Sequence, residues 1–168
     1  AFAVGDVAGK ATPAALLGSM AVGLLRAHFV EDPLRPAAML AELNSHLLKV
    51  GGDNRYVAMI YGVYDEAESL LLLANAGFPR PLLVRDGLIE EVHIAGLPLG
   101  MFKDSEYHEQ QFECRPGDIV IFCSDGVTEC ESRAGESFVS AMLPSLLRKR
   151  AALPAQQLAQ EINTEALR

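Results

Sequence analysis

Long hydrophobic runs and an excess of basic charge are both missing from this sequence of 168 residues. Its densest apolar stretch, Leu70 to Leu73, is far shorter than the roughly 20 residues that a membrane-spanning helix needs. The chain carries 14 Lys and Arg against 22 Asp and Glu, which gives a net charge of −8 without any basic stripe. Neither nucleic acid nor a membrane is therefore expected as a partner.

Cysteine is also scarce. The three cysteines, Cys114, Cys123 and Cys130, are odd in number and show no paired metal-binding spacing, so a disulfide framework is not expected. We interpret them as reduced thiols of a cytoplasmic protein, with Cys123 in the core. No signal peptide is visible, and the sequence opens on Ala1 within an apolar run. We therefore expect one domain, residues 1–168, truncated at both ends and cut from a longer regulatory protein.

Three further site types are poorly represented. None of the four histidines forms a helical i, i+4 pair, which disfavours a zinc site. The loop from Gly5 to Lys10 has three residues between its glycines rather than four, so it does not predict a phosphate-binding P-loop. Gly9 is expected in a tight turn instead. Ser124 lacks the Gly-x-Ser-x-Gly context of an esterase nucleophile.

The stretch from Asp118 to Glu129 is the most informative part of the chain. Its apolar run, Ile119 to Cys123, predicts a strand buried on both faces, after which Asp125 enters a glycine turn. A second apolar run, from Ala1, also ends in an acid, Asp6. Two buried strands that each release an aspartate suggest an oxygen-rich site for Mg²⁺ or Mn²⁺ at one end of a sheet. A simple turn or capping role for each acid remains the alternative.

Periodicity predicts the remaining elements. Helices are expected from Thr12 to about Val30, with Leu16 and Leu17 on a buried stripe, and over 36–50, with Met39, Leu40, Leu43 and Leu47 spaced for burial. Two more are expected over 137–150, with a break at Pro144, and over 154–167. Strands of period two are expected over 56–64, 70–74, 81–84, 88–93 and 107–114, with Asp86-Gly87 as a hairpin turn. The last of these strands is polar at alternate positions, so it is expected near a sheet edge. This order predicts an α+β fold, a four-layer helix–sheet–sheet–helix sandwich with two stacked, mainly antiparallel sheets.

These pieces together resemble the metal-dependent type 2C protein phosphatases, in their bacterial sporulation and stress-response (SpoIIE-like) branch. The resemblance covers nearly the whole chain, in the family's order. The matching segments are Gly-Asp-Val-Ala-Gly-Lys-Ala-Thr-Pro from Gly5, Arg-Tyr-Val-Ala-Met-Ile-Tyr-Gly-Val-Tyr-Asp from Arg55, Asn-Ala-Gly-Phe-Pro-Arg-Pro from Asn75, Gly-Leu-Pro-Leu-Gly-Met-Phe from Gly96, Pro-Gly-Asp from Pro116, Ser-Asp-Gly-Val-Thr-Glu from Ser124 and Gly-Glu-Ser-Phe from Gly135.

The resemblance implies hydrolysis of a phosphoserine or phosphothreonine by a water activated between two Mn²⁺ or Mg²⁺ ions. By motif, Asp6 would bridge both ions, the carbonyl of Val7 would bind one, and Asp125 would bind the other. The substrate implied is a regulatory protein of the anti-sigma-factor antagonist type. An upstream sensory or receiver domain in the same chain is implied as well.

The sequence departs from this family in several places. Ala11 stands where the family usually has Gly, Phe78 where it has His, and Ala58 where it often has Thr. A Gly-Gly-Asp segment ahead of residue 1 and an Asp-Asp pair after residue 168 would complete the metal site. We therefore expect these 168 residues to hold at most one weakly bound ion, on the Asp6–Val7 side. The alternatives are a catalytically silent domain that binds a partner protein, and a hydrolase of small phosphate esters.

Overall fold

The computed structural model describes residues 1–29, 35–50, 55–131, 135, 137–150 and 152–166. The chain divides into two compact units, and each is described by itself. The first contains residues 1–78 and 93–116, and the second contains residues 79–92 and 117–168. The expected single domain over residues 1–168 stays a prediction.

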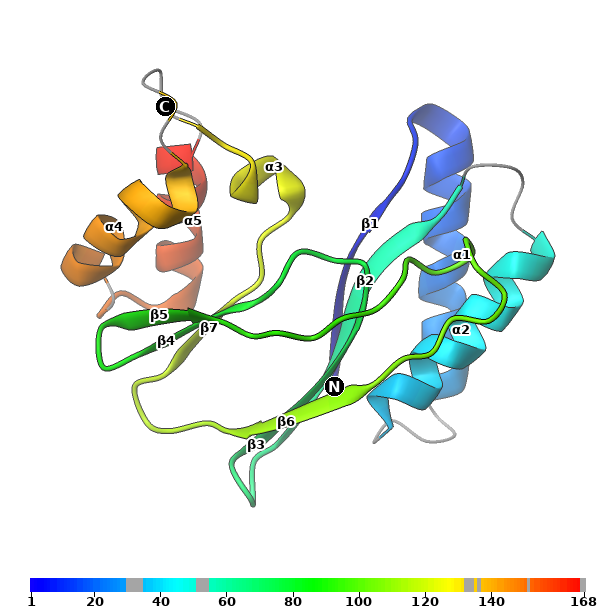
Figure 1. Ribbon diagram of the computed structural model, residues 1–168, viewed down its shortest axis with the longest axis horizontal. Coiled ribbons are helices and arrows are strands. Elements are labelled where there is room, and N and C mark those ends of the chain that lie inside the picture. Colours follow the sequence, from blue (N-terminus) through cyan, green and yellow to red (C-terminus); the bar gives the residue numbers. More distant parts are fainter. Residues whose placement is uncertain (30–34, 51–54, 132–134, 136, 151, 167–168) are drawn as a thin grey trace. The chain divides into compact units, whose positions relative to one another are not determined.

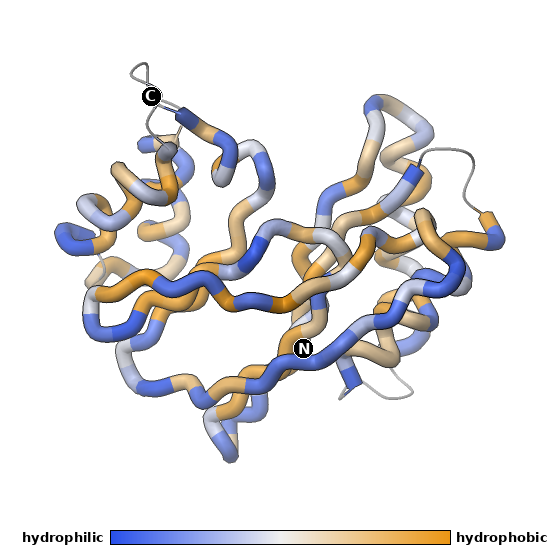
Figure 2. The backbone as a smooth tube through the Cα atoms, in the orientation of Figure 1, coloured by the Kyte–Doolittle hydropathy of each residue, from blue (hydrophilic) through white to orange (hydrophobic). Residues whose placement is uncertain are grey.

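The first unit is built on a four-stranded antiparallel sheet in the order β1-β2-β3-β6 (Figure 1). Its strands are β1 (Phe2–Val7), β2 (Val57–Asp65), β3 (Leu70–Ala76) and β6 (Glu109–Glu113). The two central strands are rich in β-branched, aromatic and leucine side chains, which suit a pleated surface packed on both sides. Figure 2 shows β3 in hydrophobic colours and the turn between β2 and β3 in hydrophilic ones.

Two helices, α1 (Ala11–Phe29) and α2 (Pro36–Val50), pack against this sheet. The predicted stripe of α2 is confirmed, since Leu40 and Leu43 are fully buried. The prediction for α1 was wrong at Leu16, which is 66% exposed, while Leu17 and Ala21 are buried. Because α1 approaches the sheet through small side chains, its buried stripe is narrower than the leucine pattern suggests.

The second unit holds a three-stranded antiparallel sheet in the order β5-β4-β7, formed by β4 (Leu82–Arg85), β5 (Leu88–Glu91) and β7 (Ile119–Ile121). The predicted hairpin turn is confirmed, since Asp86 and Gly87 have φ of 51° and 78°. Three helices follow in the chain, namely α3 (Asp125–Thr128), α4 (Leu143–Arg150) and α5 (Ala155–Ala166). The predicted break near Pro144 is a π-helical turn, Phe138–Met142, directly before α4.

The α+β class with two antiparallel sheets is confirmed, and so is the placing of residues 109–113 at a sheet edge. The prediction of two buried strands that each release an acid was wrong in its details. β1 is a half-exposed edge strand, and Asp6 lies inside it rather than after it. β7 is short and pairs on one side only, so Ile121 and Cys123 are buried while Val120 and Phe122 are half-buried.

In the described part of the chain, no helix combines the length and the apolar character that crossing a bilayer requires.

Candidate functional site

The first predicted ligand, Asp6, lies near the end of edge strand β1, opposite Ala58 of β2. Its side chain is exposed, and its Oδ1 accepts a hydrogen bond of 2.8 Å from the backbone N–H of Val7. This bond fixes one carboxylate oxygen against the backbone of the next residue. Asp6 and the predicted carbonyl ligand Val7 are therefore held in one rigid dipeptide.

An open hollow of about 640 Å³ lies beside this dipeptide, between β1 and α1. Small residues allow the close approach of the two elements. A Cβ added to Gly18 of α1 would come within 3.2 Å of a Val7 methyl group of β1. Gly5 is close to β2 instead, since a Cβ there would come within 2.9 Å of the Ala58 carbonyl oxygen. The hollow is lined by Gly5, Asp6, Val7, Ala14, Ala15, Gly18, Ser19 and Val22.

The loop that follows Asp6 turns tightly into α1. Gly9 has φ of 117°, which confirms the predicted tight turn, and Ala11 has φ of 60°. Ala11 is thus a residue with a Cβ in the left-handed region, where glycine is favoured. The loop is tied to the sheet by the N–H of Ala8, which donates to the carbonyl of Tyr56 at 2.9 Å.

The other edge of β2 is completed at this end by a loop residue. β3 pairs with β2 from Ile60 onward, and beyond that point Leu99 takes its place. Leu99 and Val57 exchange two backbone hydrogen bonds of 2.9 and 3.0 Å. Val57 also pairs with Val7 on its opposite side. The loop around Leu99 is therefore in register with the candidate metal ligands.

Two buried asparagines hold this loop in place. Asn44 Oδ1 accepts the N–H of Gly100 at 2.7 Å, and its Nδ2 donates to the carbonyl of Phe102 at 2.9 Å. Asn75 is bonded to both backbone groups of Phe78 and to the carbonyl of Ile94. The Asn75 side chain therefore braces the turn at Phe78 and the loop at Ile94.

The third predicted ligand, Asp125, belongs to the second unit. It is exposed at the start of α3, where its Oδ1 accepts the N–H of Gly126 at 2.7 Å. The predicted turn is thus one turn of helix, closed by the Glu129 N–H donating to the Asp125 carbonyl at 2.8 Å. Asp6 and Asp125 share the same local arrangement, with one oxygen bound by the N–H of the following residue.

Neighbouring polar groups of the second unit have structural roles. Asp118 forms a two-pronged ion pair with Arg85, at 2.6 to 3.2 Å, and its side chain is 6% exposed. Burial raises the pKa of the Cys123 thiol above its ordinary value, which confirms its expected core position. The Sγ of Cys130 donates to the carbonyl of Gly126 at 2.9 Å.

The histidines and the basic residues do not add ligands. His28 Nδ1 lies 3.0 Å from a carboxylate oxygen of Glu42, and its ring is 5.2 Å from that of His46, so these groups link α1 to α2. Across the described ranges, no group of three or more His, Cys, Asp or Glu side chains has the arrangement of a metal site.

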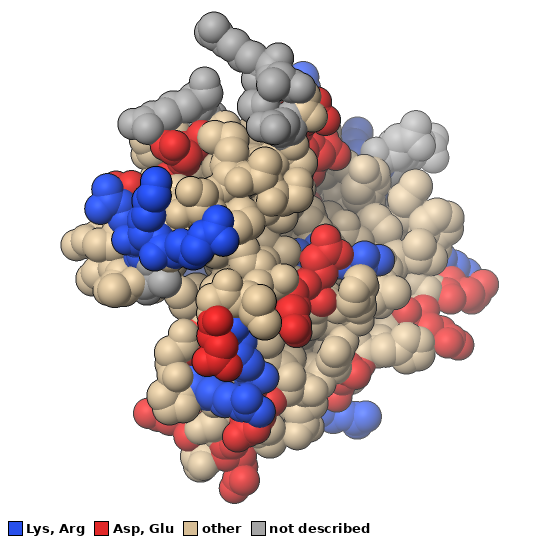
Figure 3. Space-filling model, turned by 60° about the vertical axis from the view of Figure 1, so that its left-hand side comes forward, with Lys and Arg blue, Asp and Glu red and all other residues tan. Residues whose placement is uncertain are grey.

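Figure 3 shows a basic patch over α4, whose last turn carries Arg148, Lys149 and Arg150. Cations there complement the carbonyl end of the helix.

Sequence reasoning missed Leu99 and Asn44, which position the loop beside Val7. A polar residue on the apolar stripe of α2, between Leu43 and Leu47, was the available signal for Asn44. No sequence signal identified Leu99, because its pairing with β2 depends on where β3 ends.

Solved structures with the same arrangement place the chain in a class. It aligns with the RsbU and RsbW domains of Rv1364c from Mycobacterium tuberculosis at a TM-score of 0.79 and 25% identity, over 95% of this chain and 46% of that one. The catalytic domain of the serine threonine protein phosphatase PstP, solved in complex with two manganese ions, aligns at a TM-score of 0.71 and 17% identity, over 98% of this chain and 80% of that one. These likenesses show the fold of the type 2C phosphatases, as predicted.

The family follows from the sequence itself. Residues 1–168 match the family described as Stage II sporulation protein E (SpoIIE), and the chain belongs to that family. It is also 29% identical to the phosphoserine phosphatase RsbU of Bacillus subtilis (strain 168) over 136 residues, which are 80% of this chain and 40% of that protein. The chain thus spans less than half the length of this curated relative.

Proposed function

We propose that the chain is a metal-dependent phosphatase domain that hydrolyses a phosphoserine or phosphothreonine on a regulatory protein of the anti-sigma-factor antagonist type. Family membership over all 168 residues supports this proposal, together with the likeness to a phosphoserine phosphatase. The observation that carries it is that Asp6 and Asp125 have the same exposure and the same local hydrogen bond. Both carboxylates are exposed, and in each one oxygen accepts a hydrogen bond from the N–H of the following residue.

The donors fit the metal ions that the family implies. Asp6, Asp125 and the carbonyl of Val7 would hold Mn²⁺ or Mg²⁺, since carboxylate and carbonyl oxygens are the ligands that such hard cations prefer. When bound, a pair of these ions lowers the pKa of a water and stabilises charge on the phosphoryl group. The N–H groups of Val7 and Gly126 orient the two carboxylates and keep one oxygen of each in a fixed direction. Gly5 and Gly18 both line the adjoining hollow.

The experiment that tests this function is phosphate release from para-nitrophenyl phosphate by the full protein, with and without Mn²⁺. Asp6→Asn and Asp125→Asn should each lower kcat at least 100-fold, because each removes a charged ligand while keeping its shape. Asp86→Asn is the matched control. It replaces an exposed aspartate in a hairpin turn with φ of 51°, which asparagine tolerates, so activity should stay within twofold. Activity without metal, or full activity of both ligand variants, would refute the proposal.

One structural observation favours the silent, partner-binding alternative. Ala11, directly after the loop that follows Asp6, has a strained backbone with φ of 60°. Phe78, another departure from the family pattern, does not favour it, since its side chain is 5% exposed and its backbone is held by Asn75. Calorimetric titration of the full protein with Mn²⁺ separates the two functions. Tight Mn²⁺ binding supports the enzyme, whereas partner binding without any metal binding supports the silent domain.

The wider setting belongs to the same proposal. The domain works in the cytoplasm of a bacterium, next to a sensory or receiver domain of the same protein that controls it. The greater lengths of RsbU and of the Rv1364c structure support this organisation. Phosphatase activity that does not change when the neighbouring domain is removed would contradict it.

A further inference from the structure

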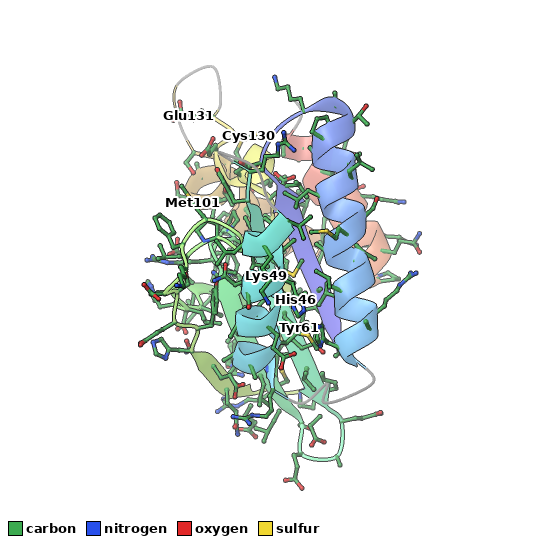
Figure 4. All side chains as sticks on the ribbon, turned by 90° about the vertical axis from the view of Figure 1, so that its right-hand side faces the viewer. His46, Lys49, Tyr61, Met101, Cys130 and Glu131 are labelled. Carbon is green, nitrogen blue, oxygen red and sulfur yellow. The ribbon has the colours of Figure 1, made fainter. Side chains whose placement is uncertain are left out.

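The loop between Ile94 and Ser105 exposes large apolar side chains. Leu97 is 48% exposed, Met101 49% and Phe102 44%. The eight residues from Ala95 to Phe102 include no charge, in a chain whose residues are 21% charged. Figure 4 shows Met101 at the outer rim of this loop. Clustered exposure of this kind marks an interaction surface more often than isolated apolar residues do.

This apolar surface is presented on a rigid backbone. Asn44 holds Gly100 and Phe102, the Oγ of Ser105 donates to the carbonyl of Phe102 at 3.0 Å, and Leu99 is bonded twice to Val57. At the other end of the loop, a Cβ added to Gly96 would lie 1.7 Å from the carbonyl oxygen of Asn75. Because the backbone is already ordered, a partner that binds here loses little conformational freedom of the loop.

The same backbone sets the distance from the loop to the candidate metal ligands. Val57 is paired with Val7 on one side and with Leu99 on the other. Neighbouring strands lie about 4.8 Å apart, so Leu99 and Val7 are about 10 Å apart across the end of the sheet. The exposed side chains lie within three residues of Leu99. A protein whose phosphorylated residue reached Asp6 and Val7 would therefore contact the exposed side chains of this loop.

Basic side chains accompany this end of the sheet. Lys10 and Arg55, both exposed, lie within two residues of the hydrogen bond between Ala8 and Tyr56. Lys103 follows the apolar stretch directly, with Asp104 after it. Because Asp104 offsets the charge of Lys103, Lys10 and Arg55 are the cations that would complement a phosphorylated, anionic partner.

We propose that Leu97, Met101 and Phe102 form a docking surface for the folded phosphoprotein substrate, which presents an apolar patch beside its phosphorylated residue. This inference rests on the proposed function and names how that substrate is selected. Small phosphate esters do not reach the surface, so it discriminates between substrates without contributing to the hydrolysis itself. The occupant is a phosphoprotein rather than a second copy of the chain, because the loop adjoins the candidate metal ligands and the exposed cations Lys10 and Arg55 lie at the same end of the sheet.

The test uses the full protein and a serine-phosphorylated anti-sigma-factor antagonist from the same organism. Affinity is measured in EDTA by calorimetry, and turnover is measured with Mn²⁺ on this protein and on para-nitrophenyl phosphate. Met101→Ser combined with Phe102→Ser should weaken binding about 10- to 100-fold, as expected for two apolar anchors. It should raise KM for the phosphoprotein by a similar factor and leave turnover of the small ester within twofold.

Three further measurements make each outcome decisive. Leu88→Ser, at a 67% exposed leucine in the second unit, is the matched control and should leave binding unchanged. Met101→Leu should retain binding, and thermal melting should show that all variants are folded. Unchanged binding of the double variant, or a change in oligomeric state instead, overturns the docking surface even if the enzyme is active. Binding that the double variant loses, in a protein that hydrolyses neither substrate, supports the surface and refutes the proposed function.

Discussion

Replacing Ala11 by glycine should stabilise the protein, although glycine usually weakens a helix. Ala11 is the first residue of α1 and has φ of 60°. The left-handed region costs a residue with a Cβ about 1–2 kcal/mol. Glycine escapes this cost but loses about 0.4–1 kcal/mol more to the entropy of the unfolded chain. The net gain in free energy of unfolding is therefore about 0.5–1 kcal/mol, equivalent to a rise in Tm of about 1–4 °C for a protein of this size.

Urea unfolding and calorimetry would measure this effect, with Ala15→Gly as the control. Ala15 is an exposed position in the same helix with negative φ, so its replacement should cost about 1 kcal/mol. The two substitutions are chemically identical, and only the backbone conformation differs. Slower amide exchange in the first turn of α1 should accompany the gain in Ala11→Gly. If both variants lost stability equally, the reasoning from the backbone angle would be refuted.

Four other outcomes are expected. Gly23→Ala should raise the free energy of unfolding by about 0.5–1 kcal/mol, because the added methyl group would lie on an exposed part of α1 and meet no atom within 4 Å. A lower urea midpoint for this variant would count against the prediction. Gly96→Ala should cost about 3 kcal/mol or more, since its Cβ would overlap the Asn75 carbonyl oxygen, and an unchanged Tm would disprove the close approach. Because its pKa is raised, Cys123 should react slowly with iodoacetamide at pH 8 and faster as pH rises through and above the ordinary thiol range, with mass spectrometry as the readout. The 168-residue chain should bind at most one Mn²⁺, weakly, and Asp6→Asn should abolish that binding; calorimetry that finds two tight sites would contradict this.

Much of the fold was predictable because local chemistry decides it. Asp86-Gly87 specifies a hairpin turn through its positive φ angles, and the spacing of Leu40 and Leu43 specifies the buried face of α2. The alternating polar residues of 107–114 indicated an edge strand, but the sequence could not reveal that β1 also lies at an edge. β1 has the apolar composition of a central strand, and only its pairing with β2 alone shows that Asp6 is an exposed edge residue.

The candidate site was predictable to a similar extent. The ordered motifs identified Asp6, Val7 and Asp125, whose metal-binding role stays a prediction, and the structure adds how each acid is oriented. The contribution of the Leu99 loop could not be predicted. Its position depends on long-range pairing with β2, over more than forty residues of intervening chain, rather than on any local pattern.

The pairing of Val57 with both Val7 and Leu99 has a consequence for how such a protein can evolve. Backbone hydrogen bonds, and not side chains, set the spacing between the aspartate that would bind metal and the loop that would recognise a substrate. Mutations at Leu97, Met101 or Phe102 can therefore accumulate without moving Asp6. A duplicated gene could acquire a new phosphoprotein target through these three positions while its hydrolytic chemistry is inherited intact.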